Sequence, residues 1–235
     1  MLRSFRARWL LVPVLLQVGL AWGSDSYVAE LSPGDAFRAV PQILAPSLDP
    51  QGFRLVANIA GRKTAICDVW WSKQIPAQAR SAAPQNLVYG ALKTGAFLGV
   101  ISYLADREDF QHHMVKAGMY TMRYAELDQN GSEQAISPYR DFAILSPIWA
   151  DRAADDIVPL EELTKRSRFV SHDDGPAVLS LVPVNPAYKT VPWAVSDDRG
   201  FCTLQVRLHQ RTGTQEKDMP FAIVLVRPPY ENEGS

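Results

Sequence analysis

Acidic and imidazole side chains gather at two points of this sequence, and they are the first residues to consider for chemistry. His112 and His113 follow an acidic stretch, and His172 directly precedes Asp173. Imidazole and carboxylate groups are common metal ligands, but adjacent residues on a strand point to opposite faces. The two neighbouring histidines are therefore not expected to share a site, and solvated loops explain the pattern equally well.

A second acidic group, Asp151, Asp155 and Asp156, could hold calcium through carboxylate and backbone oxygens. Its spacing matches no EF-hand loop. Asp155 or Asp156 with Asp173 could instead supply the acidic pair of a hydrolase. The sequence has no Gly-x-Ser-x-Gly, His-Glu-x-x-His, Walker or Gly-x-Gly-x-x-Gly motif. It therefore predicts no catalytic residue and no cofactor, with calcium as the single candidate.

Aromatic side chains offer a different chemistry, the binding of sugar rings or of partner proteins. Trp70, Tyr139 and Trp149 are the expected ligand contacts, together with Arg140 beside Tyr139. Exposed aromatic residues on a sheet or its loops bind ligands in many sandwich modules. Packing in the core is the alternative explanation for each of them. The residue types thus favour a binding module over an enzyme.

A strand that begins at Gly118 is expected to be the central element that positions these residues. Side chains alternate along it, so that one face should be apolar and the other wet. A glycine two residues before a tyrosine is typical of a tyrosine corner, in which the ring packs inward and the hydroxyl returns to nearby backbone. The apolar face would consist of Tyr120, Met122 and Tyr124.

Arg123 is expected on the wet face of the same strand. We expect it to pair with Asp141 on the following strand, a contact worth about 0.2 to 1 kcal/mol on an exposed sheet face. Gly118, Tyr120, Arg123 and Asp141 are accordingly assigned structural roles rather than ligand contacts.

This stretch resembles an uncharacterised group of secreted bacterial β-rich proteins. The resemblance rests on the Gly-x-Tyr-Thr-x-Arg-Tyr pattern within residues 116–124 and on Arg140-Asp141-Phe142, which follows a polar loop. It implies a β-rich fold and export from the cytoplasm. It transfers no catalytic residue, because no activity is attached to the pattern.

The first 23 residues are expected to be a secretory signal peptide. Arg3, Arg6 and Arg8 precede an apolar run that ends in small residues around Trp22. The run is shorter than the roughly 20 residues that a bilayer requires, so a retained anchor is the weaker alternative. We expect an exported protein, periplasmic or extracellular, with no membrane span after cleavage.

Charge and composition restrict the partners of the mature chain. The full sequence has 24 Lys and Arg against 25 Asp and Glu, and removal of the three signal arginines leaves 21 basic residues. Nucleic-acid binding requires clustered cations. A mildly acidic exported protein is therefore not expected to bind nucleic acid.

Strand patterns separated by turns dominate the rest of the sequence. They predict an all-β fold, an antiparallel β-sandwich of the immunoglobulin-like or jelly-roll-like kind, with about nine strands and one short helix. The helix should begin near Pro159, with acids in its first turn. The expected organisation is a signal peptide (1–23), an irregular lead-in (24–51), one sandwich domain (52–227) and a disordered tail (228–235).

The two cysteines lie on the apolar faces of expected strands at opposite ends of the domain. In an exported chain, Cys67 and Cys202 would form an inter-sheet disulfide. Closing so long a loop would stabilise the fold by roughly 4 to 5 kcal/mol in the chain-entropy model. Two buried free thiols are the alternative.

These patterns together predict an exported binding or envelope-associated interaction module. The expected partner is an envelope protein or a glycan. A secreted hydrolase and a purely structural envelope protein are the alternatives, and they differ in what they should show. A hydrolase needs two carboxylates in a closed cleft, whereas a structural protein needs a large apolar patch without a pocket.

Overall fold

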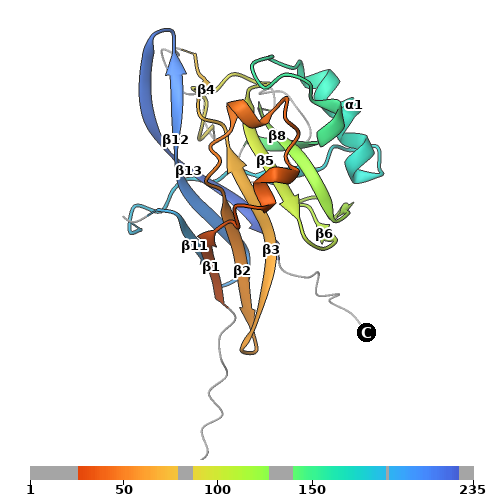
Figure 1. Ribbon diagram of the computed structural model, residues 1–235, viewed down its shortest axis with the longest axis vertical. Helices are drawn as coiled ribbons and strands as arrows, with labels where there is room; N and C mark the ends of the chain where they lie inside the picture. Colours follow the sequence, from red (N-terminus) through yellow and green to blue (C-terminus); the bar gives the residue numbers. More distant parts are fainter. Residues whose placement is uncertain (1–25, 79–86, 127–139, 189–190, 228–235) are drawn as a thin grey trace, which may run out of the picture.

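The computed structural model describes residues 26–78, 87–126, 140–188 and 191–227, and Figure 1 shows their arrangement. The expected signal peptide, the tail and Tyr139 lie outside these ranges. The described part is mostly β-structure with a single α-helix. This agrees with the coarse prediction of a β-rich fold.

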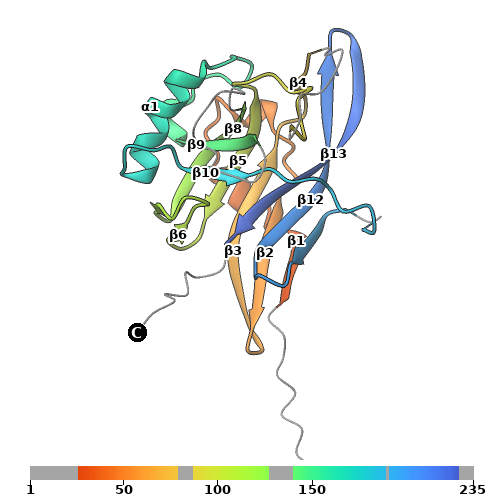
Figure 2. The same cartoon turned by 180° about the vertical axis from the view of Figure 1, so that it is seen from behind.

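The largest element is a strongly curved antiparallel sheet that forms a half-barrel (Figures 1 and 2). Neighbouring strands pair in register along most of their length, with bulges in the β2–β3 and β5–β8 pairs. In spatial order the strands are β1 (Ser26–Leu31), β2 (Phe53–Ile59), β3 (Arg62–Trp71), β5 (Phe97–Tyr103), β8 (Gly118–Glu126), β9 (Asp141–Pro147) and β10 (Val178–Ser180).

A smaller sheet lies across the open side of the half-barrel. Its strands are β11 (Trp193–Ser196), β12 (Cys202–Thr212) and β13 (Gln215–Val226), and β4 (Ile75–Pro76) pairs with β12 in parallel. The short strands β6 (Arg107–Glu108) and β7 (Met114–Val115) form a separate ribbon. The helix α1 covers Leu160–Ser171, and 3₁₀ turns cover Ala36–Ala39, Ala45–Ser47 and Ile148–Ala150.

The two sheets share one apolar core. In the larger sheet, Trp71 packs edge-on against Phe221 of the smaller sheet, with ring centroids 5.5 Å apart. Cys67 and Cys202 both lie in this core cluster. The prediction that both cysteines point inward is therefore confirmed.

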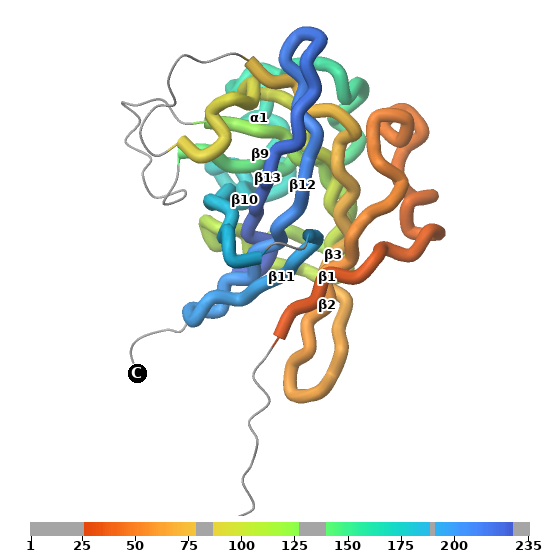
Figure 3. Tube along the Cα trace, turned by 90° about the vertical axis from the view of Figure 1, so that its left-hand side faces the viewer, coloured from red at the N-terminus to blue at the C-terminus, as the bar shows by residue number. Residues whose placement is uncertain are grey.

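A seam joins the two sheets where the chain leaves β10 and runs beside β13 (Figure 3). Leu181 forms a bridge with Ile223, and the Val182 amide donates to the carbonyl of Ala222 at 3.1 Å. The Tyr89 hydroxyl is inserted into the same seam: it donates to the Val182 carbonyl at 2.7 Å and accepts from the Ala222 amide at 2.8 Å. A side chain thus completes the ladder between the sheets.

The outer face of the large sheet is also buried, which corrects the expectation of a wet face. The lead-in segment covers Trp70, whose ring lies 6.0 Å from that of Phe37. The segment is not wholly irregular, because it contains β1 and two 3₁₀ turns. Farther along the sheet, residues 148–158 and α1 cover Arg123, which is 0 % exposed.

The helix α1 follows the charge pattern that the sequence indicates. Pro159 precedes its first residue, Glu161 and Glu162 lie in the first turn, and Arg168 lies in the last. Acids at the start and bases at the end complement the helix dipole. Its apolar side packs onto β9 (Figure 2).

Candidate functional site

Arg123 is the most completely hydrogen-bonded buried cation of the described residues. Its Nε and Nη2 atoms donate to the Asp151 carboxylate at 2.9 and 2.8 Å. Its remaining donors reach the carbonyl oxygens of Gly95 (2.7 Å), Ala153 (2.8 Å) and Asp156 (2.6 Å). The group therefore fastens the 151–156 loop onto the sheet, and it is not a ligand contact.

The expected pair between Arg123 and Asp141 is wrong. Asp141 instead accepts hydrogen bonds from the backbone amides of Val88 (3.2 Å) and Tyr89 (2.5 Å). Burial raises the pKa of the Asp141 carboxyl above its usual value, although these amide hydrogen bonds oppose the shift. Asp141 thus positions the segment that carries Tyr89, whose hydroxyl lies in the seam. The role of Asp141 is therefore structural, as expected, but with different partners.

The acidic residues proposed for calcium are not brought together as a site. Both oxygens of Asp151 accept hydrogen bonds from Arg123, so they are not free to ligate a cation. Asp155 and Asp156 are exposed. Within the described part of the chain, no group of three or more His, Cys, Asp or Glu side chains is arranged to hold a metal ion.

Asp173, one of the acids proposed for a hydrolase pair, interacts with a histidine. Asp173 contacts His113, with 3.7 Å between the carboxylate and Nε2, and the other ring nitrogen of His113 lies 3.0 Å from buried Asp109. His113 therefore links its own turn to the loop that carries Asp173.

The two tryptophans proposed as ligand contacts differ in their burial. Trp70 is 1 % exposed and belongs to the core under the lead-in, so its assignment as a ligand contact is wrong. Trp149 is 67 % exposed and packs edge-to-face on the equally exposed Phe169, with centroids 5.8 Å apart. A shallow hollow of about 310 Å³ lies beside them. Arg140 immediately precedes β9.

The tyrosine corner is confirmed. The Tyr120 hydroxyl donates to the Lys116 carbonyl at 2.8 Å, and its ring packs against Tyr103. Gly118 has φ 154°, a backbone conformation that residues with a side chain rarely adopt. Both residues shape the start of β8, and both also line the hollow beside Trp149.

Cys67 and Cys202 are free thiols in this structure. Burial raises the pKa of both groups, that of Cys202 to about 12. Thiols with such values carry almost no thiolate at neutral pH and react slowly. The expected disulfide is therefore not formed here, and it stays a prediction for the oxidised protein.

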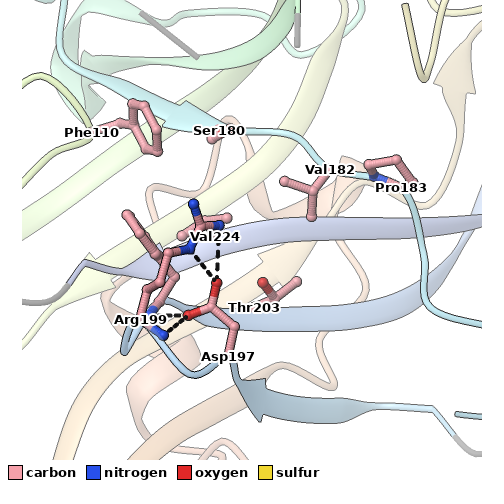
Figure 4. A pocket seen from close by; sticks show the side chains of 9 residues that line it. Phe110, Ser180, Val182, Pro183, Asp197, Arg199, Thr203 and Val224 are labelled. Atoms are coloured by element: carbon pink, nitrogen blue, oxygen red, sulfur yellow. Dashed lines mark hydrogen bonds and ion pairs between the residues drawn. The ribbon is translucent and has the colours of Figure 1, made fainter. Parts of the chain in front are cut away.

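A pocket lies at the seam between the sheets, and Figure 4 shows the side chains around it. Its volume of about 520 Å³ falls in the range of small-ligand sites. We call it the seam pocket. Strands β10, β12 and β13, the β6–β7 turn and the β11–β12 turn contribute its lining residues, which are Phe110, Ser180, Val182, Pro183, Asp197, Arg199, Phe201, Thr203 and Val224.

One carboxylate organises the β11–β12 turn at the rim of this pocket. Asp197 Oδ1 accepts from the backbone amides of Arg199 (3.1 Å) and Phe201 (2.9 Å). Its Oδ2 accepts from Nε (3.3 Å) and Nη2 (3.2 Å) of Arg199. Gly200, with φ 85°, allows the chain to reverse. The turn therefore fixes the direction of the Arg199 guanidinium (Figure 4).

Two aromatic rings and two guanidinium groups form a continuous stack along the pocket wall. Arg199 lies 5.2 Å from the Phe201 ring centroid, and Phe201 stacks on Phe110 at 6.0 Å and 27°. Arg227 lies 5.8 Å from the Phe110 centroid and donates to its carbonyl at 2.6 Å. Both ends of the stack are thus cationic.

A second hollow of about 410 Å³ lies on the same outer face of β12 and β13. Along β12, Thr203 lines the seam pocket, whereas Gln205 and Arg207 line this second hollow. Gln205 accepts a hydrogen bond from the Asn185 amide at 3.1 Å. The chain segment after β10 is thereby attached to the sheet, with one hollow on each side.

Sequence patterns gave no indication of the seam pocket. Its ring partners, Phe110 and Phe201, are far apart in the chain, and each reads as an isolated apolar residue next to a turn. The one local signal is the Asp-x-Arg-Gly-Phe order of residues 197–201, which is typical of a tight turn. Only the strand topology brings the two rings together.

No family model, no curated protein and no solved structure matches the chain. The resemblance to a group of secreted β-rich proteins therefore stays a prediction. In the described ranges, no helix combines the length and apolar character needed to cross a membrane.

Proposed function

We propose that this protein is an exported binding module of the cell envelope and that the seam pocket is its ligand site. The observation that carries the proposal is the pocket itself, which combines two phenylalanine rings with a fixed guanidinium and a hydroxyl. Ligand sites are typically concave and mostly apolar, with a few placed polar groups. The seam pocket has this composition.

The elements around the pocket make it suitable for selective binding. Ser180 is buried at the end of β10, and Thr203 and Val224 face each other on paired strands. These three residues lie on strands, and the β11–β12 turn is held by the hydrogen bonds of Asp197. A preformed site loses less entropy on binding. A small ligand, or one side chain of a larger partner, suits such a pocket.

Export is supported by the basic, apolar and small-residue order of residues 1–23. The finer fold assignment, an antiparallel sandwich, is supported by the single core that both sheets share. The larger sheet differs from the flat layer of a simple sandwich because it curves into a half-barrel. Because the segment after β10 also bonds to β13, we propose a sandwich whose two sheets are joined along one edge, at the seam.

A ligand screen on the mature protein tests the proposal. Backbone amide NMR spectra would be recorded from Ser24 onward with a panel of small acids, amines, sugars and neutral aromatics. We expect shifts confined to residues around Ser180, Phe201 and Val224. Shifts that cluster elsewhere, or a panel without any shift, would contradict the proposal.

A pair of variants on β12 sharpens this screen. Thr203→Phe fills the seam pocket, whereas Thr212→Phe adds the same ring at the far end of the same strand. We expect Thr203→Phe to abolish binding and Thr212→Phe to preserve it. Equal binding by both variants would locate the ligand outside the pocket.

A second candidate function is protein docking at Trp149 and Phe169, whose side chains are both about two-thirds exposed. Sugar hydroxyls need hydrogen-bonding groups, and the only side-chain hydroxyl in the adjacent hollow, that of Tyr120, already donates to Lys116. An apolar side chain of a protein partner suits this surface better than a glycan does. The hydrolase alternative has less support, because Asp173 contacts His113 instead of a second acid.

A further inference from the structure

We propose that the seam pocket selects small organic anions with a planar aromatic body, such as aryl carboxylates or sulfonates. This inference rests on the proposed function, since it names the ligand class of the same pocket. It follows from the hydrogen bonds that the pocket residues still have available, from the charges around the pocket and from the way its rings are stacked.

The anion preference follows from which polar groups are already used. Asp197 accepts four hydrogen bonds, two from backbone amides and two from Arg199. Arg199 Nη1 donates to no group in the described part of the chain, nor does the Thr203 hydroxyl. The pocket therefore offers a fixed charged donor and a neutral donor, while its one lining carboxylate is saturated. A carboxylate or sulfonate provides the matching acceptors.

The charged groups around the pocket also favour a negatively charged ligand. Arg199 and Arg227 lie at the two ends of the stack, and Asp197 offsets one of them. Asp198, the other acid of the turn, is exposed. The Arg199 side chain is 76 % exposed, so its unused N–H groups are accessible to a ligand from solvent.

The aromatic preference follows from the stack. The contacts order its members as Arg199, Phe201, Phe110 and Arg227. At a centroid separation of 6.0 Å the two rings are stacked with an offset, which leaves their edges available to a ligand in the pocket. Ring edges carry partial positive charge, and they attract the electron-rich face of another aromatic ring. A planar aromatic anion can satisfy the ring edges and Arg199 together.

A matched pair of probes tests this inference directly. Titration calorimetry and amide NMR would compare 2-naphthoate with 2-naphthamide, which has the same rings but no charge. We expect the amide to bind about tenfold more weakly, because it loses the charge-assisted hydrogen bonds to Arg199. We also expect naphthoate binding to weaken as salt is added.

Three variants assign the selectivity to named groups. Arg199→Gln should reduce the tenfold preference for the anion to near equality, and Thr203→Val should weaken both probes. Arg207→Gln is the control, because Arg207 lines the neighbouring hollow on the same face of β12. We expect it to leave both affinities unchanged. An amide spectrum of each variant verifies that the fold is retained.

The outcomes separate this inference from the proposed function. Equal affinity of both probes for the wild-type protein would overturn anion selection and leave a pocket for neutral aromatics. Unchanged preference in Arg199→Gln would overturn the role of Arg199. If neither probe binds but another ligand shifts the amide signals of the pocket residues, the proposed ligand class is wrong. The proposal that the seam pocket binds a ligand is then retained. If nothing binds there, both proposals fail.

Discussion

Arg123 uses all five of its N–H donors on partners within the fold, and the Phe97 ring lies 5.4 Å from its guanidinium carbon. Such a group is costly to bury unless every donor is satisfied. Asp151 balances its charge and is itself fully buried. At the scale of single residues, this pair holds the loop over the sheet where a wet surface was expected.

Removal of the Arg123 guanidinium should destabilise the protein severely. In Arg123→Met, buried Asp151 loses its closest charge partner and, among the described residues, keeps only Arg166, whose Nη1 lies 3.5 Å from Oδ1. We expect a loss of about 3 to 5 kcal/mol in the free energy of unfolding. Urea denaturation followed by tryptophan fluorescence measures it. Arg152→Met, an exposed neighbour of the same loop, is the control. A loss below about 1 kcal/mol for Arg123→Met would contradict the role given to the pair.

Two tryptophans provide a matched comparison of burial. Trp70→Ala opens a cavity beneath the lead-in and should cost about 3 to 5 kcal/mol. Trp149→Ala removes an exposed ring and should change stability by no more than about 0.5 kcal/mol. Chemical denaturation of the two variants measures the difference. Similar losses would show that Trp149 has a structural role.

Asp141 should make the stability of the fold depend on pH in a defined direction. Burial raises its pKa in the folded state, so the folded protein binds this proton more tightly than the unfolded chain does. The contribution of Asp141 is therefore most favourable below about pH 4 and declines as pH rises through the raised pKa.

The variant Asp141→Asn should remove this part of the pH dependence. It also leaves one of the two amides of Val88 and Tyr89 without an acceptor, at a cost of about 1 to 3 kcal/mol. Unfolding free energies of both proteins across the acidic range measure the two effects. Asp198→Asn, an exposed acid in the β11–β12 turn, serves as the control. Parallel pH curves for the wild type and Asp141→Asn would refute the assignment.

At the scale of elements, the seam is the connection on which the pocket depends. The Tyr89 hydroxyl satisfies the carbonyl of Val182, in the segment after β10, and the amide of Ala222 in β13. Few backbone hydrogen bonds join the sheets directly at this point. A side chain from a distant turn therefore determines how the segment after β10 lies beside β13.

Tyr89→Phe should remove the hydrogen bonds that the hydroxyl makes in the seam, and it should leave no cavity because the ring is retained. We expect a loss of about 1 to 3 kcal/mol, because a buried carbonyl and a buried amide lose their partner. Hydrogen exchange at Ala222 should become faster. Tyr103→Phe is the control, since Tyr103 is equally buried and its hydroxyl has no hydrogen bond among the described residues. Equal effects from both changes would argue against the bridging role.

The sequence allowed most long elements to be predicted, because each has its own pattern. The strand from Gly118 (β8), the two strands that carry the cysteines (β3 and β12) and the helix after Pro159 (α1) are all present. The short edge strands β1 and β11 were missed, since so few residues establish no alternation. Trp70 and Arg123 were misjudged for a different reason: segments distant in the sequence cover them, and no local pattern indicates such a cover.

At the scale of the whole molecule, the two thiols report on the redox state of the folded protein. Burial raises the pKa of Cys67 and Cys202, so a thiol reagent should leave the native protein unlabelled for long times. After denaturation without reductant, two labelled thiols per chain indicate the free form. No labelled thiol indicates that the predicted disulfide has formed.

The division of the core between two sheets affects how the chain can mature. In an exported protein the amino-terminal part crosses the membrane first, so the half-barrel emerges before residues 193–226 are available. Its concave apolar side, including Cys67, then faces solvent or a chaperone until the smaller sheet arrives. If the protein is exported, as we propose, its translocation intermediates should therefore be prone to aggregation until the last hairpin covers this surface.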